Sequence, residues 1–220
     1  DRAAVNSLAA PVQGWREIFD VMPTDTAEHW ATIATRMGKV PAALEQIKVT
    51  LLALGVSILI AMPAGLLLGH YGRGEFVAVS AGNAGRAIPE LALIALMAAA
   101  IGVGLTNLTI ALAILGIPPI LTNTFVGIKQ VERSSVDAAE GMGMNVWQVI
   151  TRVELPMAIP TIMGGVRTSG INIIATATIA PLVGILTLGD FIISRNVYSD
   201  AGVLAGAILV ALMALALELS

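Results

Sequence analysis

The amino-acid sequence predicts an all-α integral membrane protein with about five core transmembrane helices. Three observations predict this fold class. Of the 220 residues, 56% are hydrophobic and only 12% are charged, whereas soluble domains carry about a quarter charged residues. Asp, Glu, Lys and Arg are absent from residues 49–72, 91–128, 168–189 and 201–217. Apolar runs such as Leu66-Leu67-Leu68 do not alternate with polar residues, as the strands of a membrane barrel would.

A helix that crosses a bilayer needs about 20 mostly apolar residues. The charge-free stretch 91–128 is too long for one crossing, and turn residues at Gly102-Val103-Gly104 divide it. Each span is expected to be helical, because lipid offers the backbone no other hydrogen-bond partner. The predicted spans cover residues 50–68, 76–101, 108–128, 159–182 and 202–217.

The N-terminal stretch is more polar, since its first 48 residues hold 11 of the 27 formally charged side chains. Apolar residues recur there at helical spacing and predict two short amphipathic helices on the membrane surface; packing against the protein's own extramembrane face is an equal alternative. We therefore divide the chain into an N-terminal extramembrane segment, 1–46, and a transmembrane domain, 47–220. The chain does not begin with Met and ends directly after a span, so we expect either end to be truncated.

Composition also argues against several functions. The net charge of −3 gives no footprint for nucleic acid. Cysteine is absent, and the two histidines, His29 and His70, are too few for a His-rich metal site. No phosphate-binding Gly-x-x-x-x-Gly-Lys-Ser/Thr motif and no catalytic constellation occurs. We expect no catalytic residue, metal or cofactor on this chain, and a nucleotide site only on another chain.

The segment 129–156, between the third and fourth predicted spans, carries the most information. Ser134 with Asp137 three residues later predicts a capping-box-like helix start. Gly143 is suited to the left-handed conformation that ends a helix. Asn145, with Gln148 at the third position, predicts the start of a second short helix, which Leu155-Pro156 stops before the next span. The segment is thus predicted to project from the membrane as two short helices joined by a glycine.

This segment resembles the EAA loop of the permease subunits of binding-protein-dependent ABC importers. Asp137-Ala138-Ala139, Gly143 and Val153-Glu154-Leu155-Pro156 match its spacing without a gap, although the family prefers Glu at the first position and Ile at Val153. The resemblance implies a coupling helix that docks into a groove of a cytoplasmic ATPase; an ordinary cytoplasmic helix hairpin is the alternative. The residues it assigns to ATPase coupling are Asp137, Ala138, Ala139, Glu140, Gly141, Gly143, Met144, Trp147, Leu155 and Pro156.

Four other segments are similar to the subfamily that imports osmoprotectants such as glycine betaine, choline and carnitine. They are Gly85-Arg86-Ala87-Ile88-Pro89-Glu90-Leu91-Ala92-Leu93, Pro119-Ile120-Leu121-Thr122-Asn123-Thr124, Ala175-Thr176-Ala177-Thr178-Ile179-Ala180 and Leu188-Gly189-Asp190-Phe191-Ile192. That subfamily often has Gly-Gly where this chain has Leu186-Thr187. The resemblance covers about residues 46–217.

The resemblance implies the type I importer fold of five core helices, with an outer N-terminus and a cytoplasmic C-terminus, in a prokaryotic cytoplasmic membrane. It also implies a second permease subunit, identical or homologous, two ATPase subunits that hold ATP and Mg, and an extracytoplasmic substrate-binding protein. Three alternatives stay open. They are the same architecture importing another solute such as an amino acid or sulfonate, an ATPase-independent channel or carrier, and a membrane-embedded enzyme, which the shortage of His, Cys and paired carboxylates disfavours.

Polar residues inside the spans are functional candidates, because membrane-embedded charges face protein or water. Asn83, Arg86 and Glu90 share one helix face, and Arg86 can pair with Glu90. Arg167 falls near the predicted midplane, and Asn172 follows on the same span. We expect these five residues to line the pathway or gate; the alternative for the charged ones is a structural ion pair joining spans two and four. Aromatic residues are only 4%, too few for an aromatic cage around an ammonium group, so we expect solute selectivity to reside in the binding protein.

Overall fold

The computed structural model describes residues 41–72, 74–76, 78, 80, 82 and 89–219. The amphipathic helices predicted within residues 1–40 lie outside this description, as do Asn83 and Arg86. The described helices are, in chain order, α3 (Pro41–His70), α5 (Glu90–Ile101), α6 (Leu105–Lys129), α7 (Arg133–Gly141), α8 (Val146–Val149), a π-helical turn η1 (Ile150–Glu154), α9 (Leu155–Thr176), a 3-10 helix η2 (Ala177–Val183), α10 (Gly189–Ile193) and α11 (Arg195–Glu218).

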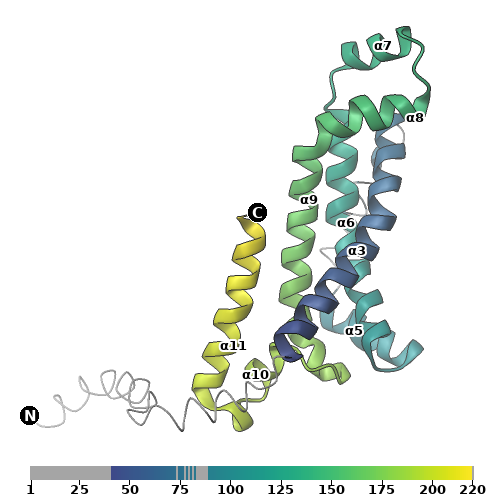
Figure 1. Cartoon of the computed structure of the whole chain (residues 1–220). Helices are drawn as coiled ribbons and strands as arrows, with labels where there is room; N and C mark the ends of the chain where they lie inside the picture. The colour runs from purple at the N-terminus through teal and green to yellow at the C-terminus, as the bar shows by residue number, and fades with distance from the viewer. Residues whose placement is uncertain are drawn as a thin grey trace, which may run out of the picture.

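Four of the described helical stretches are long and apolar enough to cross a membrane. They cover Ala42–His70, Leu105–Lys129, Val146–Val183 and Arg195–Glu218. Each contains one of the predicted spans, so the first, third, fourth and fifth predictions are confirmed. α3 begins at one end of the bundle, whereas the α7–α8 loop lies at the other end, toward which the C-terminal end of α11 also points (Figure 1).

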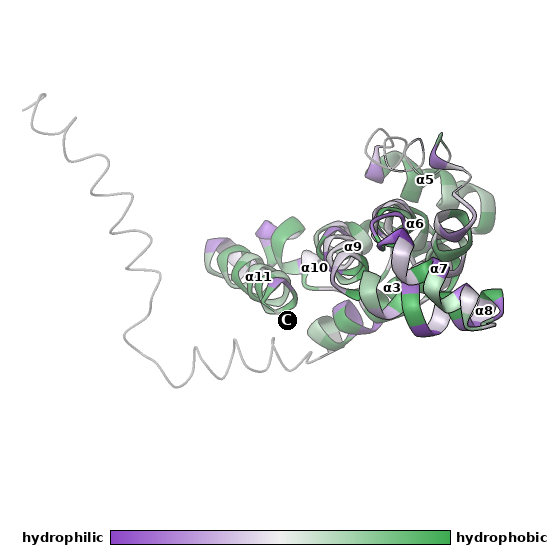
Figure 2. Cartoon of the chain, turned by 90° about the horizontal axis from the view of Figure 1, so that it is seen from above, coloured by the Kyte–Doolittle hydropathy of each residue, from purple (hydrophilic) through white to green (hydrophobic). Residues whose placement is uncertain are grey.

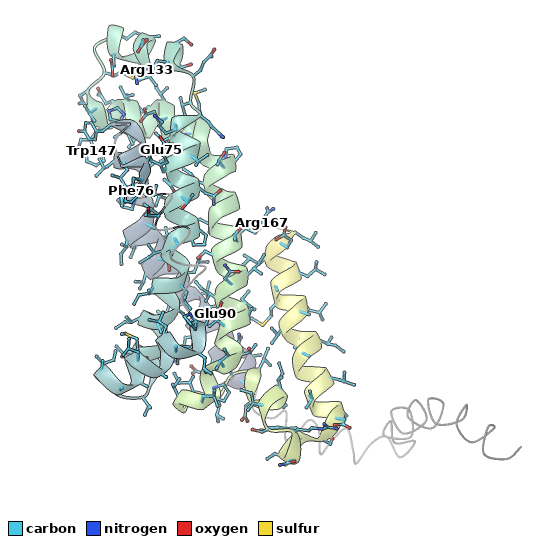
Figure 3. The ribbon with its side chains drawn as sticks, turned by 180° about the vertical axis from the view of Figure 1, so that it is seen from behind. Glu75, Phe76, Glu90, Arg133, Trp147 and Arg167 are labelled. Atoms are coloured by element: carbon cyan, nitrogen blue, oxygen red, sulfur yellow. The ribbon has the colours of Figure 1, made fainter. Side chains whose placement is uncertain are left out.

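The second predicted span, 76–101, is wrong as a single helix. Pro89 is extended (φ −65°, ψ 114°), and α5 begins only at Glu90 and has 12 residues, too few for a crossing. Glu75 and Phe76 lie toward the α8 end of the bundle, whereas Glu90 lies well toward the opposite end (Figure 3). Glu75 and Glu90 therefore lie at different levels along the bundle. Proline explains the break, because it lacks the amide hydrogen that a continuous helix needs.

α3, α6 and α9 pack side by side as the core of the bundle (Figure 1). They meet at Gly116 of α6, where the Ser169 hydroxyl donates to the Gly116 carbonyl (2.9 Å) and the Ser57 hydroxyl lies close to the Ala113 carbonyl (3.0 Å). Without a hydrophobic driving force in lipid, such close contacts between small residues hold helices together. Gly165 also packs tightly against α6, whereas Gly164 borders open space.

α11 stands at the side of this core. It contacts α9 and α10, and Gly206 is its one buried residue in the described chain. Seen from above, α11 is mostly hydrophobic in colour, whereas more hydrophilic residues occur at the α7–α8 end (Figure 2). An apolar exposed helix beside a polar end is the distribution expected for a chain whose sides face lipid and whose end faces water.

Candidate functional site

The segment from 129 to 156 forms a cap over one end of the bundle, with α7 beyond α8 (Figure 1). α7 begins at Arg133, and its N-cap Glu132 is extended and makes no side-chain cap. The predicted capping box of Ser134 and Asp137 is therefore absent, because Ser134 already lies inside the helix. Asp137 instead lies 3.5 Å from Arg133 in an exposed i,i+4 ion pair, the kind that adds little stability.

The connection between α7 and α8 follows the sequence prediction. Gly143 has φ +81°, the left-handed region. The Asn145 side chain accepts from the Gln148 amide (3.0 Å), and the Gln148 side chain accepts from the Asn145 amide (2.9 Å). This reciprocal pair is a complete capping box. The predicted glycine bend and second helix start are both confirmed.

The end of α8 differs from the prediction. Leu155-Pro156 does not stop the helix, since α8 continues through the π-helical turn η1 into α9. Pro156 has no amide hydrogen for the carbonyl of Arg152, and its ring would crowd that carbonyl in a regular α-helix. A wider π turn before proline relieves this conflict. The helix changes direction there, with α8 lying across the end of the bundle and α9 running along it (Figure 1).

The loop has a small hydrophobic core of its own. Val136, Ala139 and Val149 are buried together, and Met144 packs against them. Of the adjacent alanines in the EAA-like motif, Ala139 is therefore a packing residue, whereas Ala138 is exposed. Leu155 is half-buried, and the other residues that the resemblance assigned to coupling are exposed: Asp137, Glu140, Gly141, Gly143, Trp147 and Pro156.

Two exposed apolar residues of the loop were not predicted as site residues. Met142 is 72% exposed and Val146 is 43% exposed, close in sequence to Trp147 at 64%. We define the loop tip as Ala138, Gly141, Met142, Val146 and Trp147. The signal in the sequence was the occurrence of large apolar side chains on a short polar loop that cannot bury all of them.

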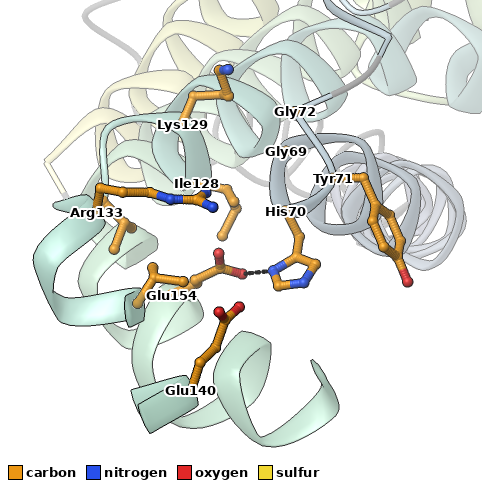
Figure 4. Close-up of a pocket in the computed structure, with 11 residues that line it drawn as sticks. Gly69, His70, Tyr71, Gly72, Ile128, Lys129, Arg133, Glu140 and Glu154 are labelled. Atoms are coloured by element: carbon orange, nitrogen blue, oxygen red, sulfur yellow. Dashed lines mark hydrogen bonds and ion pairs between the residues drawn. The ribbon is translucent and has the colours of Figure 1, made fainter. Parts of the chain in front are cut away.

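A polar cavity of about 430 Å³ lies where the loop meets the ends of α3 and α6 (Figure 4). Its lining includes the charged side chains of Lys129, Arg133, Glu140 and Glu154, as well as His70. His70 Nδ1 lies 2.8 Å from Glu154 Oε2, and their side chains are only 9% and 5% exposed. Sequence reasoning missed this pair, since 84 residues separate its members.

Of the candidate pathway residues, Glu90, Arg167 and Asn172 lie in the described part of the chain, and Glu90 and Arg167 lie apart along the bundle (Figure 3). Glu90 accepts a hydrogen bond from the Thr176 hydroxyl (2.7 Å), which joins α5 to the end of α9. Arg167 is half-buried and lies on the side of α9 toward the end of α11 (Figure 3), with no ion-pair partner among the described residues. The alternative of an ion pair joining spans two and four is thus not formed between Glu90 and Arg167. Asn172 is exposed.

The family follows from comparison with known proteins. The model of the binding-protein-dependent transport system inner membrane component matches residues 57–220. The chain belongs to this family. The permease is therefore an inner-membrane transport component that works with a binding protein and an ATPase. It is not itself catalytic, and its family indicates no cofactor on this chain.

Named relatives support the resemblance to the osmoprotectant subfamily. The permease is 35% identical to the glycine betaine/carnitine/choline transport system permease protein OpuCB of Bacillus subtilis, over 79% of this chain and 81% of the relative. It is 37% identical to the carnitine transport permease protein OpuCB of Listeria monocytogenes, over 77% and 78%. The osmoprotectant import permease protein OsmY of Salmonella typhimurium is 36% identical, over 74% and 70%.

Solved structures confirm the fold. An inward-facing structure of the MetNI methionine ABC transporter matches with a TM-score of 0.72, covering 82% of the permease and 91% of that chain at 20% identity. A crystal structure of an amino acid ABC transporter with histidines matches with a TM-score of 0.67, covering 86% and 93%. At this identity the likeness concerns the fold alone, and it confirms the predicted importer-type helical architecture.

Proposed function

We propose that the permease forms the translocation pathway for a compatible solute of the glycine betaine, choline, carnitine or proline type. The observation that carries the proposal is the identity of 34–37% to several permeases named for glycine betaine, carnitine or choline. A second permease subunit, identical or homologous, completes the pathway, and two ATPase subunits hold ATP and Mg. The proposal keeps the division into an extramembrane segment, 1–46, and a membrane domain, 47–220, with α3 beginning at Pro41 before that boundary.

The loop tip is the surface that docks on the ATPase. Its apolar side chains are exposed at the polar end of the bundle, where neither lipid nor the loop's own core covers them. Exposed apolar residues with a polar surround are typical of protein interfaces, and Trp147 is the residue type that most often dominates such contacts. Asp137 and Glu140 supply exposed acidic groups beside the tip.

The loop's construction suits it to pass motion into the membrane. Its buried residues Val136, Ala139 and Val149 hold α7 against α8, so the two short helices move as one body. α8 is continuous with α9 through η1, so rotation of the loop tilts α9. ATPase closure would in this way change the arrangement of the spans, and Glu90, Arg167 and Asn172 are the described residues proposed to line the pathway, with Asn83 and Arg86.

Selectivity is tested by exchanging the binding protein. Proteoliposomes holding the assembled transporter are supplied with the cognate binding protein, and uptake of labelled betaine, choline, carnitine, proline, histidine and taurine is compared. We expect uptake of the quaternary ammonium solutes, and a changed preference when a docking-competent binding protein of another specificity is used. Uptake restricted to histidine or taurine with the cognate binding protein would contradict the proposed solute class.

A further inference from the structure

We propose that the buried His70–Glu154 contact is the link through which the coupling loop positions α3, and that this contact is needed for efficient transport per ATP hydrolysed. The inference rests on the proposed importer function. His70 is the last residue of α3, and Glu154 is the last residue of η1. The contact therefore joins the end of one span to the turn at which the loop enters another.

The chemistry of the two side chains decides which one donates the hydrogen bond. An ionised carboxylate can only accept hydrogen bonds, so with Glu154 ionised the imidazole Nδ1–H is the donor of this contact. Lys129, Arg133 and Glu140 line the same cavity. Among the described residues, however, the hydrogen-bond partner of the Glu154 side chain is His70. A carboxylate this deeply buried is costly without a partner.

The surroundings explain why one contact can matter. α3 is seated closely on α6 near this end, because Cβ atoms at Gly65 and Gly69 would lie 2.6 Å from Thr124 and Ile128 side-chain atoms. α3 packs much less against η1 than against α6. The cavity of about 430 Å³ also leaves the space around His70 and Glu154 partly unfilled. Glu154 and His70 therefore form a direct polar link between η1 and α3, beside the apolar cluster that Val131 and Leu155 share with α3 residues such as Leu66.

The test uses substitutions of matched shape at His70 in the fully assembled transporter. In His70→Asn the amide nitrogen occupies the place of Nδ1 and still donates, whereas His70→Leu has a similar shape and no donor. The readout is solute taken up per ATP hydrolysed in proteoliposomes. We expect His70→Leu to lower this ratio about fivefold, and His70→Asn to stay within about twofold of the parent. Lys129→Met, which changes another residue of the cavity lining, is expected to keep the parental ratio.

A double substitution separates a shared role from two independent ones. If the two residues act as one link, His70→Leu combined with Glu154→Leu lowers the ratio no further than the more affected single variant. Yield of the complex and its thermal unfolding are measured for every variant. If His70→Leu fails to assemble, His70→Ser takes its place, because its short hydroxyl keeps the site polar without reaching Glu154.

An unchanged ratio in an assembled His70→Leu or His70→Ser complex would overturn the proposal, as would additive losses in the double variant or an equal loss in His70→Asn. These results leave the proposed importer function intact. That function fails on a different observation, namely the absence of ATP-dependent uptake by the unsubstituted permease.

Discussion

Glu90 and Thr176 are joined by a hydrogen bond of 2.7 Å although 86 residues separate them in sequence. Glu90 is the first residue of α5 and Thr176 the last of α9. The bond ties the short helix to the end of a span, at the opposite end of the bundle from the loop. Glu90 was predicted as a pathway residue and stays a candidate for that role, but its described partner is structural.

Replacing Thr176 by Val removes the hydroxyl donor and keeps the shape of the side chain. We expect the free energy of unfolding to fall by about 1 kcal/mol, the usual size of such a bond. Glu90→Gln should cost less, because its amide oxygen still accepts the bond. Thermal unfolding of the purified permease complex measures both, and an equal or larger loss in Glu90→Gln would show that the charge matters more than the bond.

Gly143→Val should uncouple the transporter while the chain stays inserted in the membrane. A Cβ at this position meets no atom within 4 Å, so space is not limiting. The limiting factor is the backbone, because Gly143 has a positive φ of +81° that β-branched residues rarely adopt. Gly143→Asn is the matched control, because Asn tolerates the left-handed region. Normal uptake and normal binding-protein-stimulated ATPase activity in Gly143→Val would show that Gly143 is not needed for coupling.

Trp147→Ala should weaken association with the ATPase without unfolding the loop. The side chain is 64% exposed and takes no part in the buried core of Val136, Ala139 and Val149. We expect the dissociation constant for the ATPase to rise about tenfold or more, as for an aromatic residue central to an interface. Titration of ATPase against the detergent-purified permease measures this constant. Trp147→Phe keeps an aromatic ring and should retain most of the affinity; unaltered binding by the Ala variant would place the docking surface elsewhere.

Gly116→Ala should destabilise the packing of three helices. An added Cβ would lie 2.5 Å from Ser57 Oγ and 2.7 Å from Ser169 Oγ. We expect a loss of about 1–3 kcal/mol in the free energy of unfolding, the usual cost of overpacking. Gly164→Ala is the control, since a Cβ there meets nothing within 4 Å and alanine is the better helix former. Equal thermal stability of the two variants would contradict the close packing at Gly116.

The sequence predicted well what depends on local chemistry. Four spans followed from charge-free length, and the Gly143 bend and Asn145–Gln148 cap followed from residues within one turn of each other. The second span was predicted wrongly because hydropathy measures only apolar character and does not register the helix break at Pro89. The start of α7 was misplaced because Ser134 has a cap-forming side chain, yet the helix begins one residue before it. His70 and Glu154 could not be paired in advance, since their contact depends on how α3 and η1 meet in space.

The central claim is that this chain imports solute at the expense of ATP hydrolysed by another subunit. The most direct measurement is uptake of labelled glycine betaine into proteoliposomes that hold the permease with its ATPase and binding protein, with either ATP or ADP on the ATPase side. The account predicts accumulation above the external concentration with ATP and none with ADP or without the binding protein. Equal uptake with ATP and ADP, or uptake by the permease alone, would show an ATPase-independent channel or carrier and contradict it.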